Sequence, residues 1–258
     1  MFKWIGLALG FVVFGFIGAL LGYFAGAAFD RYRQLGAGGF NPGTASQRQT
    51  VFLETLFTLK GWLAKADGVI TQDEITHVEA FIQKIGMSAE HRQQAIQLFK
   101  TGAAAEFNLA DTMQRFNAHC GRTANLRHTL MVYLIVMAMA DGKVDKAEQT
   151  ALQQIAGCLN YSDHEFNQLL NMVIGQAHFS GTSSQTSPSA LEDAYQALGV
   201  TADNSDQEIK RAYRKLMSQH HPDKLMGQGV PKDMIDVATE KTKEIQLAYD
   251  LIKKQRDI

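Results

Sequence analysis

The sequence predicts an all-α chain with a single transmembrane helix, a central domain of about seven helices and a C-terminal module of three main helices. Three observations support this prediction. A long run near the start carries no charge, apolar residues further on recur every three or four positions, and no stretch alternates as a half-buried strand does. With 258 residues, the chain can form modest folded modules in addition to a membrane helix.

Composition and charge exclude several classes of partner. The formal net charge is −1, so neither nucleic acid nor a broadly anionic partner is expected, and an electrostatic partner must meet a local patch. Cys120 and Cys158 are too sparse for a disulfide framework and form no CxxC motif. We therefore expect buried structural thiols in a reducing compartment and no bound cofactor.

The first element is a membrane span. Trp4 to Phe29 is a run of 26 residues without charge, whereas a bilayer core needs roughly 20 helical residues. Glycines at intervals of four, interrupted by Phe14, follow one helix face and predict a homodimer formed by close helix packing, unless they only reflect the abundance of glycine in membrane helices. These glycines are Gly6, Gly10, Gly18, Gly22 and Gly26.

A cleaved signal peptide is the alternative to this span, because residues 25–27 imitate a small-residue cleavage site. The apolar run is longer than the roughly 7 to 15 residues of a signal peptide, which favours a permanent anchor. Arg31, Arg33 and Arg48 follow the run and only Lys3 precedes it. This asymmetry predicts that the C-terminal bulk lies in the cytoplasm.

Two stretches lack periodic apolar residues, namely residues 34–48 and 179–189, and we interpret both as flexible tethers. The second is crowded with serine and threonine, and it would let the last module sample orientations freely. The expected division is 1–31 transmembrane anchor, 32–48 linker, 49–178 helical domain, 179–189 Ser/Thr-rich linker and 190–258 C-terminal module.

The central domain shows helical periodicity throughout. Two apolar stripes cover about residues 52–66 and 75–85, and the run from Leu130 to Ala140 is apolar all round. That run is too short to cross a membrane, so it predicts a central core helix. Further amphipathic segments cover about residues 88–100, 106–119, 123–140, 145–158 and 162–176.

An internal repeat lies within this domain. The segment from Lys65 to Glu74 recurs 74 residues later at 140–148, and each copy ends one helix at Asp-Gly and begins another. The repeat predicts two related helical hairpins. Its spacing also matches the second half of an EF-hand calcium loop, but the residues at the first two ligand positions are apolar or basic.

A structural role explains the same residues of the repeat. Gly68 and Gly142 can close one helix, while Thr71 with Glu74, and Asp145 with Glu148, can form capping boxes that open the next. The duplicated hairpins resemble the TerB-type domain of tellurite-resistance proteins over about 130 residues, and this resemblance implies metal binding by clustered acidic residues. The candidate ligands are Asp67, Asp73, Glu74, Asp141, Asp145 and Glu148.

The C-terminal module begins with a short helix that Gly199 stops, and Ser205 caps a second helix. The module holds 11 Lys plus Arg against 12 Asp plus Glu, yet four cations share one sector of the second helix. They are Lys210, Arg211, Arg214 and Lys215. This helix leads into His221-Pro222-Asp223-Lys224, where proline ends the helix, and a third helix is expected from about Lys232 to Lys254.

This array resembles a J-domain, with further matches at Tyr195-x-x-Leu198-Gly199-Val200 and Glu244-Ile245-x-x-Ala248-Tyr249. The resemblance implies that the basic helix docks on a DnaK-type chaperone and that His221, Pro222 and Asp223, with Lys224 beside them, promote ATP hydrolysis by that partner. The chain itself would not be an enzyme. It departs from the family at Thr242, where phenylalanine is usual, and in a longer loop expected from Leu225 to Pro231.

The order of the three parts resembles the DjlA-type family of membrane-anchored co-chaperones. This implies a single-pass protein of the bacterial inner membrane whose middle domain selects a client or regulator that the sequence does not identify. A membrane-tethered TerB-like scaffold or metal-responsive protein, whose J-domain only positions it, is the alternative. A J-domain that binds a chaperone without stimulating it is less favoured, because the tripeptide and the basic helix are intact.

Overall fold

The computed structural model describes residues 42–65, 72–84, 86–139, 144–180 and 188–256. The chain divides into two compact units, 1–45 and 46–258, and the second unit holds nearly all of the described residues. The predicted membrane span and its glycines lie outside the described ranges. Within those ranges, no helix combines the length and the apolar character that a bilayer crossing requires.

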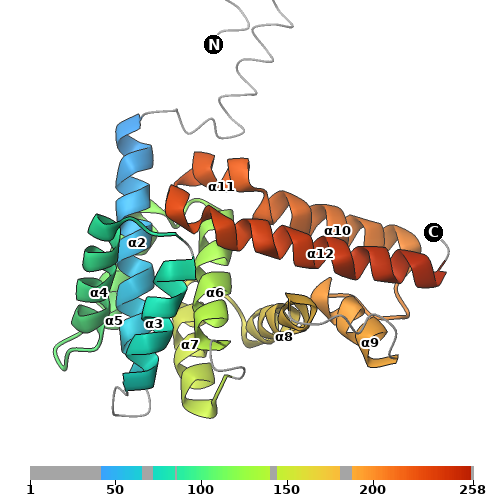
Figure 1. Ribbon diagram of the computed structural model, residues 1–258, viewed down its shortest axis with the longest axis horizontal. Helices are drawn as coiled ribbons and strands as arrows, with labels where there is room; N and C mark the ends of the chain where they lie inside the picture. Colours follow the sequence, from blue (N-terminus) through green and yellow to red (C-terminus); the bar gives the residue numbers. More distant parts are fainter. Residues whose placement is uncertain (1–41, 66–71, 85, 140–143, 181–187, 257–258) are drawn as a thin grey trace, which may run out of the picture. The chain divides into compact units, whose positions relative to one another are not determined.

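The described part of residues 42–180 is helical and holds no strand, as expected. The first helix begins at Pro42, however, inside the linker predicted at 32–48. Figure 1 shows α2, α3, α4, α5 and α6 gathered together in one part of the second unit. The helices are α2 (Pro42–Ala64), α3 (Gln72–Lys84), α4 (Ala89–Gly102), α5 (Leu109–His119), α6 (Ala124–Ala138), α7 (Lys146–Cys158) and α8 (Asp163–Ser180). The prediction of about seven helices is confirmed.

Helix α6 is the central helix of this domain, as its apolar sequence predicts. Nearly all of its side chains from Thr129 onward are buried, so it has no solvated face. Phe52 of α2 packs its ring edge-on against Tyr133 of α6 at 6.2 Å and lies 6.4 Å from the ring of Phe116 in α5. Such aromatic pairs add to the stabilisation from burial alone.

A close helix crossing depends on two glycines. A Cβ atom at Gly61 of α2 would lie 1.9 Å from the Phe99 carbonyl oxygen, and one at Gly102 of α4 would lie 1.8 Å from that of Thr58. No side chain fits at such distances, so α2 and α4 can approach only because both positions are glycine.

The C-terminal module consists of α9 (Pro188–Ala197), α10 (Asp206–His220), α11 (Pro222–Gln228), a 3₁₀ turn (Lys232–Met234) and α12 (Ile235–Arg256). Helices α10 and α12 lie side by side (Figure 1). Gly199, which ends α9, has φ +66°, and Ser205 caps α10 as expected. Ser205 also forms a capping box with Glu208. One expectation is wrong: much of the segment from Leu225 to Pro231 is not a loop, because α11 continues to Gln228.

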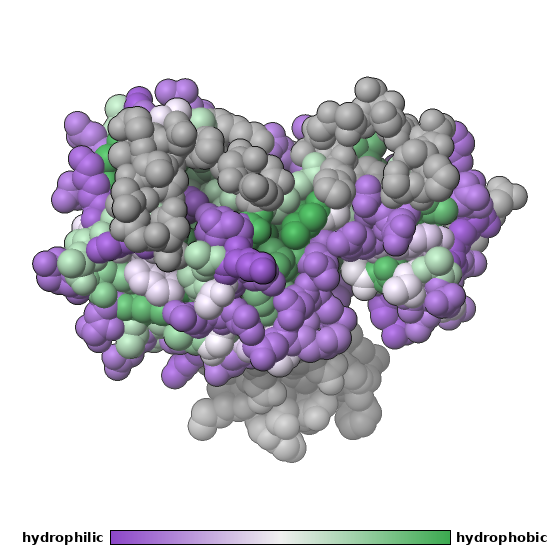
Figure 2. All heavy atoms as spheres, turned by 90° about the horizontal axis from the view of Figure 1, so that it is seen from below, coloured by the Kyte–Doolittle hydropathy of each residue, from purple (hydrophilic) through white to green (hydrophobic). Residues whose placement is uncertain are grey.

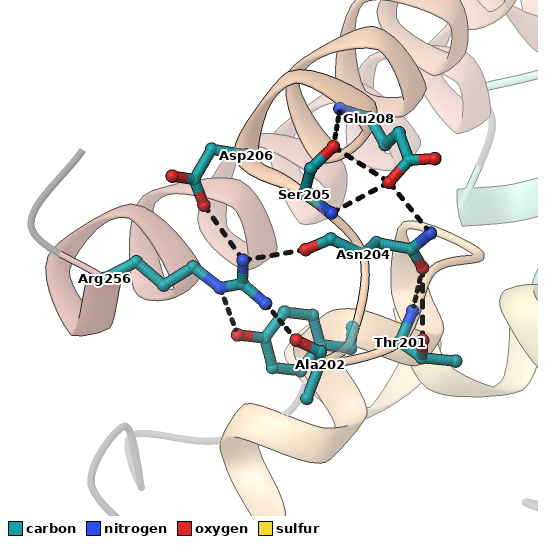
Figure 3. Close-up of polar contacts among 8 residues, drawn as sticks. Thr201, Ala202, Asn204, Ser205, Asp206, Glu208 and Arg256 are labelled. Carbon is teal, nitrogen blue, oxygen red and sulfur yellow. Dashed lines mark hydrogen bonds and ion pairs between the residues drawn. The ribbon is translucent and has the colours of Figure 1, made fainter.

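Arg256 ties the end of α12 to the loop before α10 (Figure 3). Its guanidinium donates to the Tyr195 hydroxyl at 2.7 Å, to the Asn204 carbonyl at 2.8 Å and to the Asp206 carboxylate at 2.9 Å, and it also bonds to the Ala202 carbonyl. The fixed fork of the arginine side chain suits such a set of acceptors. These bonds hold the loop before α10 against the end of α12.

The C-terminal module also packs against the middle domain, which differs from the expectation of a free tether. Helix α8 contacts both α9 and α12. The Gln176 side chain of α8 is buried and donates from Nε2 to the Ala197 carbonyl at 3.0 Å. The composition of residues 179–189 could not predict this, because the contacts are made by the helices on either side.

Candidate functional site

The His-Pro-Asp turn, residues His221 to Asp223, joins α10 to α11. His221 has an extended backbone (φ −61°, ψ 122°) and serves both as the C-cap of α10 and as the N-cap of α11. Pro222 occupies the first position of α11, where a helix has no use for a backbone N–H donor. The His221 and Asp223 side chains are exposed, so the turn presents its two polar groups to solvent.

Beside the turn lies the basic face of α10, defined as Lys210, Arg211, Arg214 and Lys215. All four side chains are exposed. Lys224 of α11 extends this charged surface, because its Nζ donates to the Ser218 hydroxyl of α10 at 3.0 Å. The structure therefore brings together on one helix pair all eight residues that the sequence predicts for chaperone binding.

The base of the turn is buried and uncharged. The His220 side chain is only 1% exposed, and its ring lies 5.6 Å from that of His128 in α6. Burial, with the nearby His128 and Lys241, lowers the pKa of His220 to about 3, and burial with Lys215 lowers that of His128 to about 4. Both rings are therefore neutral at pH 7, and neither Nε2 atom has a hydrogen-bond partner among the described residues.

Side chains of the middle domain bond to both flanks of the turn. Asn125 at the start of α6 donates from Nδ2 to the Gln219 carbonyl at 3.1 Å and to the Gln228 Oε1 atom at 2.7 Å. The Tyr133 hydroxyl donates to the Met234 carbonyl at 2.8 Å. Sequence reasoning missed both residues, because their partners lie about a hundred positions away and no local pattern marks them.

A cleft of about 1300 Å³ adjoins this region. Its lining includes the cations Lys215 and Lys224 of the C-terminal module and Arg127 of α6, beside the neutral His128. The face of the molecule seen in Figure 2 is mostly hydrophilic, with hydrophobic side chains near its centre and in smaller areas toward both sides. Among the described residues, Met226 and Leu247 are the large hydrophobic side chains that stand exposed.

The acidic residues of the repeat are described only in part. Asp145 and Glu148 form a capping box at the start of α7, with the Glu148 N–H donating to Asp145 Oδ1 at 2.8 Å. The Glu148 carboxylate also lies 3.7 Å from Lys60 Nζ. The capping role predicted for this pair is confirmed, and no cluster of three potential metal ligands occurs within the described part of the chain.

The other candidate ligands do not test the metal hypothesis. Asp67 and Asp141, with the glycines that follow them, lie outside the described residues, and so do the side chains of Asp73 and Glu74. Metal binding by this cluster therefore stays a prediction.

Neither cysteine forms a disulfide. Cys120 is buried, and burial raises the pKa of its thiol to about 11, so it stays protonated at neutral pH. Cys158 is only half-buried, which corrects the expectation that both thiols lie in the core. The buried stripe of α7 runs through Ala151, Leu152, Ile155 and Ala156, and Cys158 lies outside this stripe.

Comparison with known proteins covers the whole chain. Three family models match in order: the co-chaperone DjlA transmembrane domain at residues 1–49, the tellurite resistance protein TerB at 54–171 and the DnaJ domain at 193–257. Proteins called co-chaperone protein DjlA from Photobacterium profundum and Pasteurella multocida are 36% and 33% identical to the chain. Each alignment covers 98% of this chain and at least 97% of the relative.

The chain belongs to the DjlA co-chaperone family. A relative of the same description from Coxiella burnetii is 35% identical over 99% of this chain and 98% of its own length. No solved structure matches the chain. The predicted resemblance is thereby confirmed, and with it the order of a membrane-anchor segment, a TerB domain and a terminal J-domain.

Proposed function

We propose that this protein is a membrane-anchored co-chaperone that stimulates the ATPase of a DnaK-type chaperone through its His-Pro-Asp turn. The anchor would hold it in the bacterial inner membrane, with the C-terminal bulk in the cytoplasm. The middle domain would select a client or a regulator. Because ATP is hydrolysed in the active site of the partner, the protein itself would be a regulator and not an enzyme.

One observation carries this proposal: the exposed His-Pro-Asp turn is continuous with the exposed basic face of α10. A partner with an acidic surface can meet both at once. Cations on a solvated face steer the association with such a partner. Salt weakens this attraction, since the Debye length is roughly 8 Å at physiological ionic strength. Proline at the first position of α11 stiffens the turn that delivers His221 and Asp223.

The domain division predicted from the sequence completes the proposal. The anchor at 1–31, the helical domain at 49–178 and the J-domain at 190–258 would follow one another along the chain, and α2 and α9 begin at Pro42 and Pro188, inside the two stretches predicted as linkers. The glycine face of the anchor would mediate a homodimer, which a membrane self-association reporter tests by comparing wild type with Gly22→Leu. Titration calorimetry with calcium, magnesium and zinc tests the acidic hairpins, and no heat would remove the metal hypothesis.

The proposed function is tested by single-turnover ATP hydrolysis on a DnaK-type chaperone, with the full chain in nanodiscs. Wild type should accelerate hydrolysis, and His221→Gln should lose about tenfold or more of that acceleration, as expected when a polar group that acts only in the activated complex is removed. His221 is exposed at a helix junction, so the variant should fold normally.

A matched control is His164→Gln, which makes the same change at an exposed position of α8. This variant should stimulate as wild type does. Failure of wild type to accelerate hydrolysis would instead favour a membrane-tethered scaffold whose J-domain only positions it.

A further inference from the structure

The ends of the His-Pro-Asp turn are held from outside the J-domain. Gln219 lies in the last turn of α10, where backbone carbonyls find no N–H donor within the helix. Its carbonyl accepts a hydrogen bond from the side-chain amide of Asn125 instead. The Gln228 side chain, at the end of α11, accepts from the same nitrogen of Asn125. One amide of the middle domain thus links the two helices between which the turn lies.

Asn125 is itself well fixed. It lies in the first turn of α6, the central helix of the middle domain, and its backbone carbonyl accepts from the Thr129 hydroxyl at 2.8 Å. Leu126 and nearly all residues from Thr129 onward are buried, so the helix cannot shift without disturbing the core. A second bond from the same helix, between Tyr133 and the Met234 carbonyl, holds the chain beyond α11.

The contact lies behind the turn and does not cover it. His221, Asp223 and the basic face remain exposed while Asn125 makes both of its bonds. A partner can therefore bind the turn in this arrangement, which favours a supporting role over an inhibitory one. The neutral rings of His128 and His220 pack against each other at the base of the turn. Neither Nε2 atom forms a hydrogen bond with the described residues, so this pair does not fix the turn through those atoms.

We propose that Asn125 is a positioning residue for the His-Pro-Asp turn, so that the middle domain takes a direct part in chaperone stimulation. Asn125 sets the angle between α10 and α11 and thereby the place of His221 and Asp223 relative to the basic face. This inference rests on the proposed function. It assigns to the TerB domain a task besides the choice of client.

The test compares Asn125→Leu with wild type in a titration of chaperone stimulation, with the full chain in nanodiscs. Leucine has a similar branched shape but donates no hydrogen bond. The maximal stimulation should fall about fivefold, while the half-saturating concentration should change less than about twofold, because the basic face is intact. Gln228→Leu removes only one of the two bonds and should give an intermediate plateau.

The matched control is Asn117→Leu. Asn117 also donates its amide to a carbonyl in the last turn of a helix, that of Cys158 at 3.1 Å, but within the middle domain. Its plateau should equal that of wild type. A merely structural role for Asn125 would lower stimulation equally in both variants, and this outcome would overturn the inference.

Hydrogen exchange without the chaperone gives an independent readout. Asn125→Leu should speed exchange of the backbone amide of Leu225, which donates to the His221 carbonyl at 3.1 Å, at least about fivefold, while Asn117→Leu should not. An unchanged exchange rate, or a plateau for Asn125→Leu at or above that of wild type, would contradict the positioning role. A wild type that fails to stimulate would refute the proposed function itself, and the exchange data would then show whether Asn125 still orders the turn.

Discussion

At the scale of single residues, the structure separates groups that meet a partner from groups that hold them. His221 and Asp223 are exposed and accessible, whereas their neighbour His220 is 1% exposed and packs against His128. Two adjacent histidines therefore have opposite roles. Helical geometry explains which histidine is buried: His220, the last residue of α10, continues the buried stripe of that helix, whereas His221 leaves the helix.

The buried histidine predicts a dependence of stability on pH. The pKa of His220 is lowered by burial from 6.5 to about 3, with contributions from His128 and Lys241. Between these values the unfolded chain binds a proton that the folded chain rejects, so the free energy of unfolding falls as the pH drops below 6.5. The expected slope is about 1.4 kcal/mol per pH unit for this group.

Urea unfolding between pH 7 and pH 4 checks this slope, with His220→Leu as the comparison. In the variant, the free energy of unfolding should depend less steeply on pH, by the slope that corresponds to about one proton bound on unfolding. Its stability at pH 7 can also change. Equal slopes for the two proteins would mean that His220 titrates normally in the folded state.

Sequence reasoning identified the exposed residues of the site and not the ones that support them. The tripeptide and the basic helix are local patterns, so spacing alone placed His221, Lys210 and Arg214 on neighbouring elements. Asn125 has no such pattern, because its significance depends on a contact with residues 94 and 103 positions away. Contacts of this kind depend on tertiary packing, and no periodic pattern in the sequence marks them.

At the scale of elements, capping and glycine chemistry decide where helices end and how closely they pack. Ser205 and Asp145 each cap the start of a helix, as the sequence predicts, and both form capping boxes. The crossing of α2 and α4 was not predicted, because Gly61 and Gly102 are separated by a stretch of chain that contains α3 and leaves no local pattern for their contact. Likewise, proline was expected to lead into a loop but begins the short helix α11.

Replacing a crossing glycine tests this packing. Gly102→Ala should destabilise the protein by about 1–3 kcal/mol or more, because its Cβ would overlap the backbone of Thr58 and force the two helices apart. Gly157→Ala is the matched control in α7, where nothing lies within 4 Å of the added Cβ.

The control should stabilise by up to about 1 kcal/mol through helix propensity alone. Chemical denaturation of the two variants measures both effects. A neutral Gly102→Ala would show that α2 and α4 are free to separate.

At the scale of the whole molecule, a nearly neutral chain concentrates positive charge on one helix. The net charge of −1 hides the basic face, which only the pattern within α10 reveals. The composition also suggested a freely tethered terminal module, whereas α8 contacts α9 and α12. Composition describes a linker but not the helices beside it, so the interaction of the two modules could not be foreseen.

The central claim is that the turn activates the chaperone while the basic face binds it. Titrating the full chain in nanodiscs against a DnaK-type chaperone separates the two roles. The account predicts that His221→Gln lowers the maximal stimulation with little change in its midpoint, whereas Lys210→Glu with Arg214→Glu raises the midpoint about tenfold or more, an effect that added salt reduces. Equal curves for wild type and both variants, or no stimulation by any of them, would contradict it.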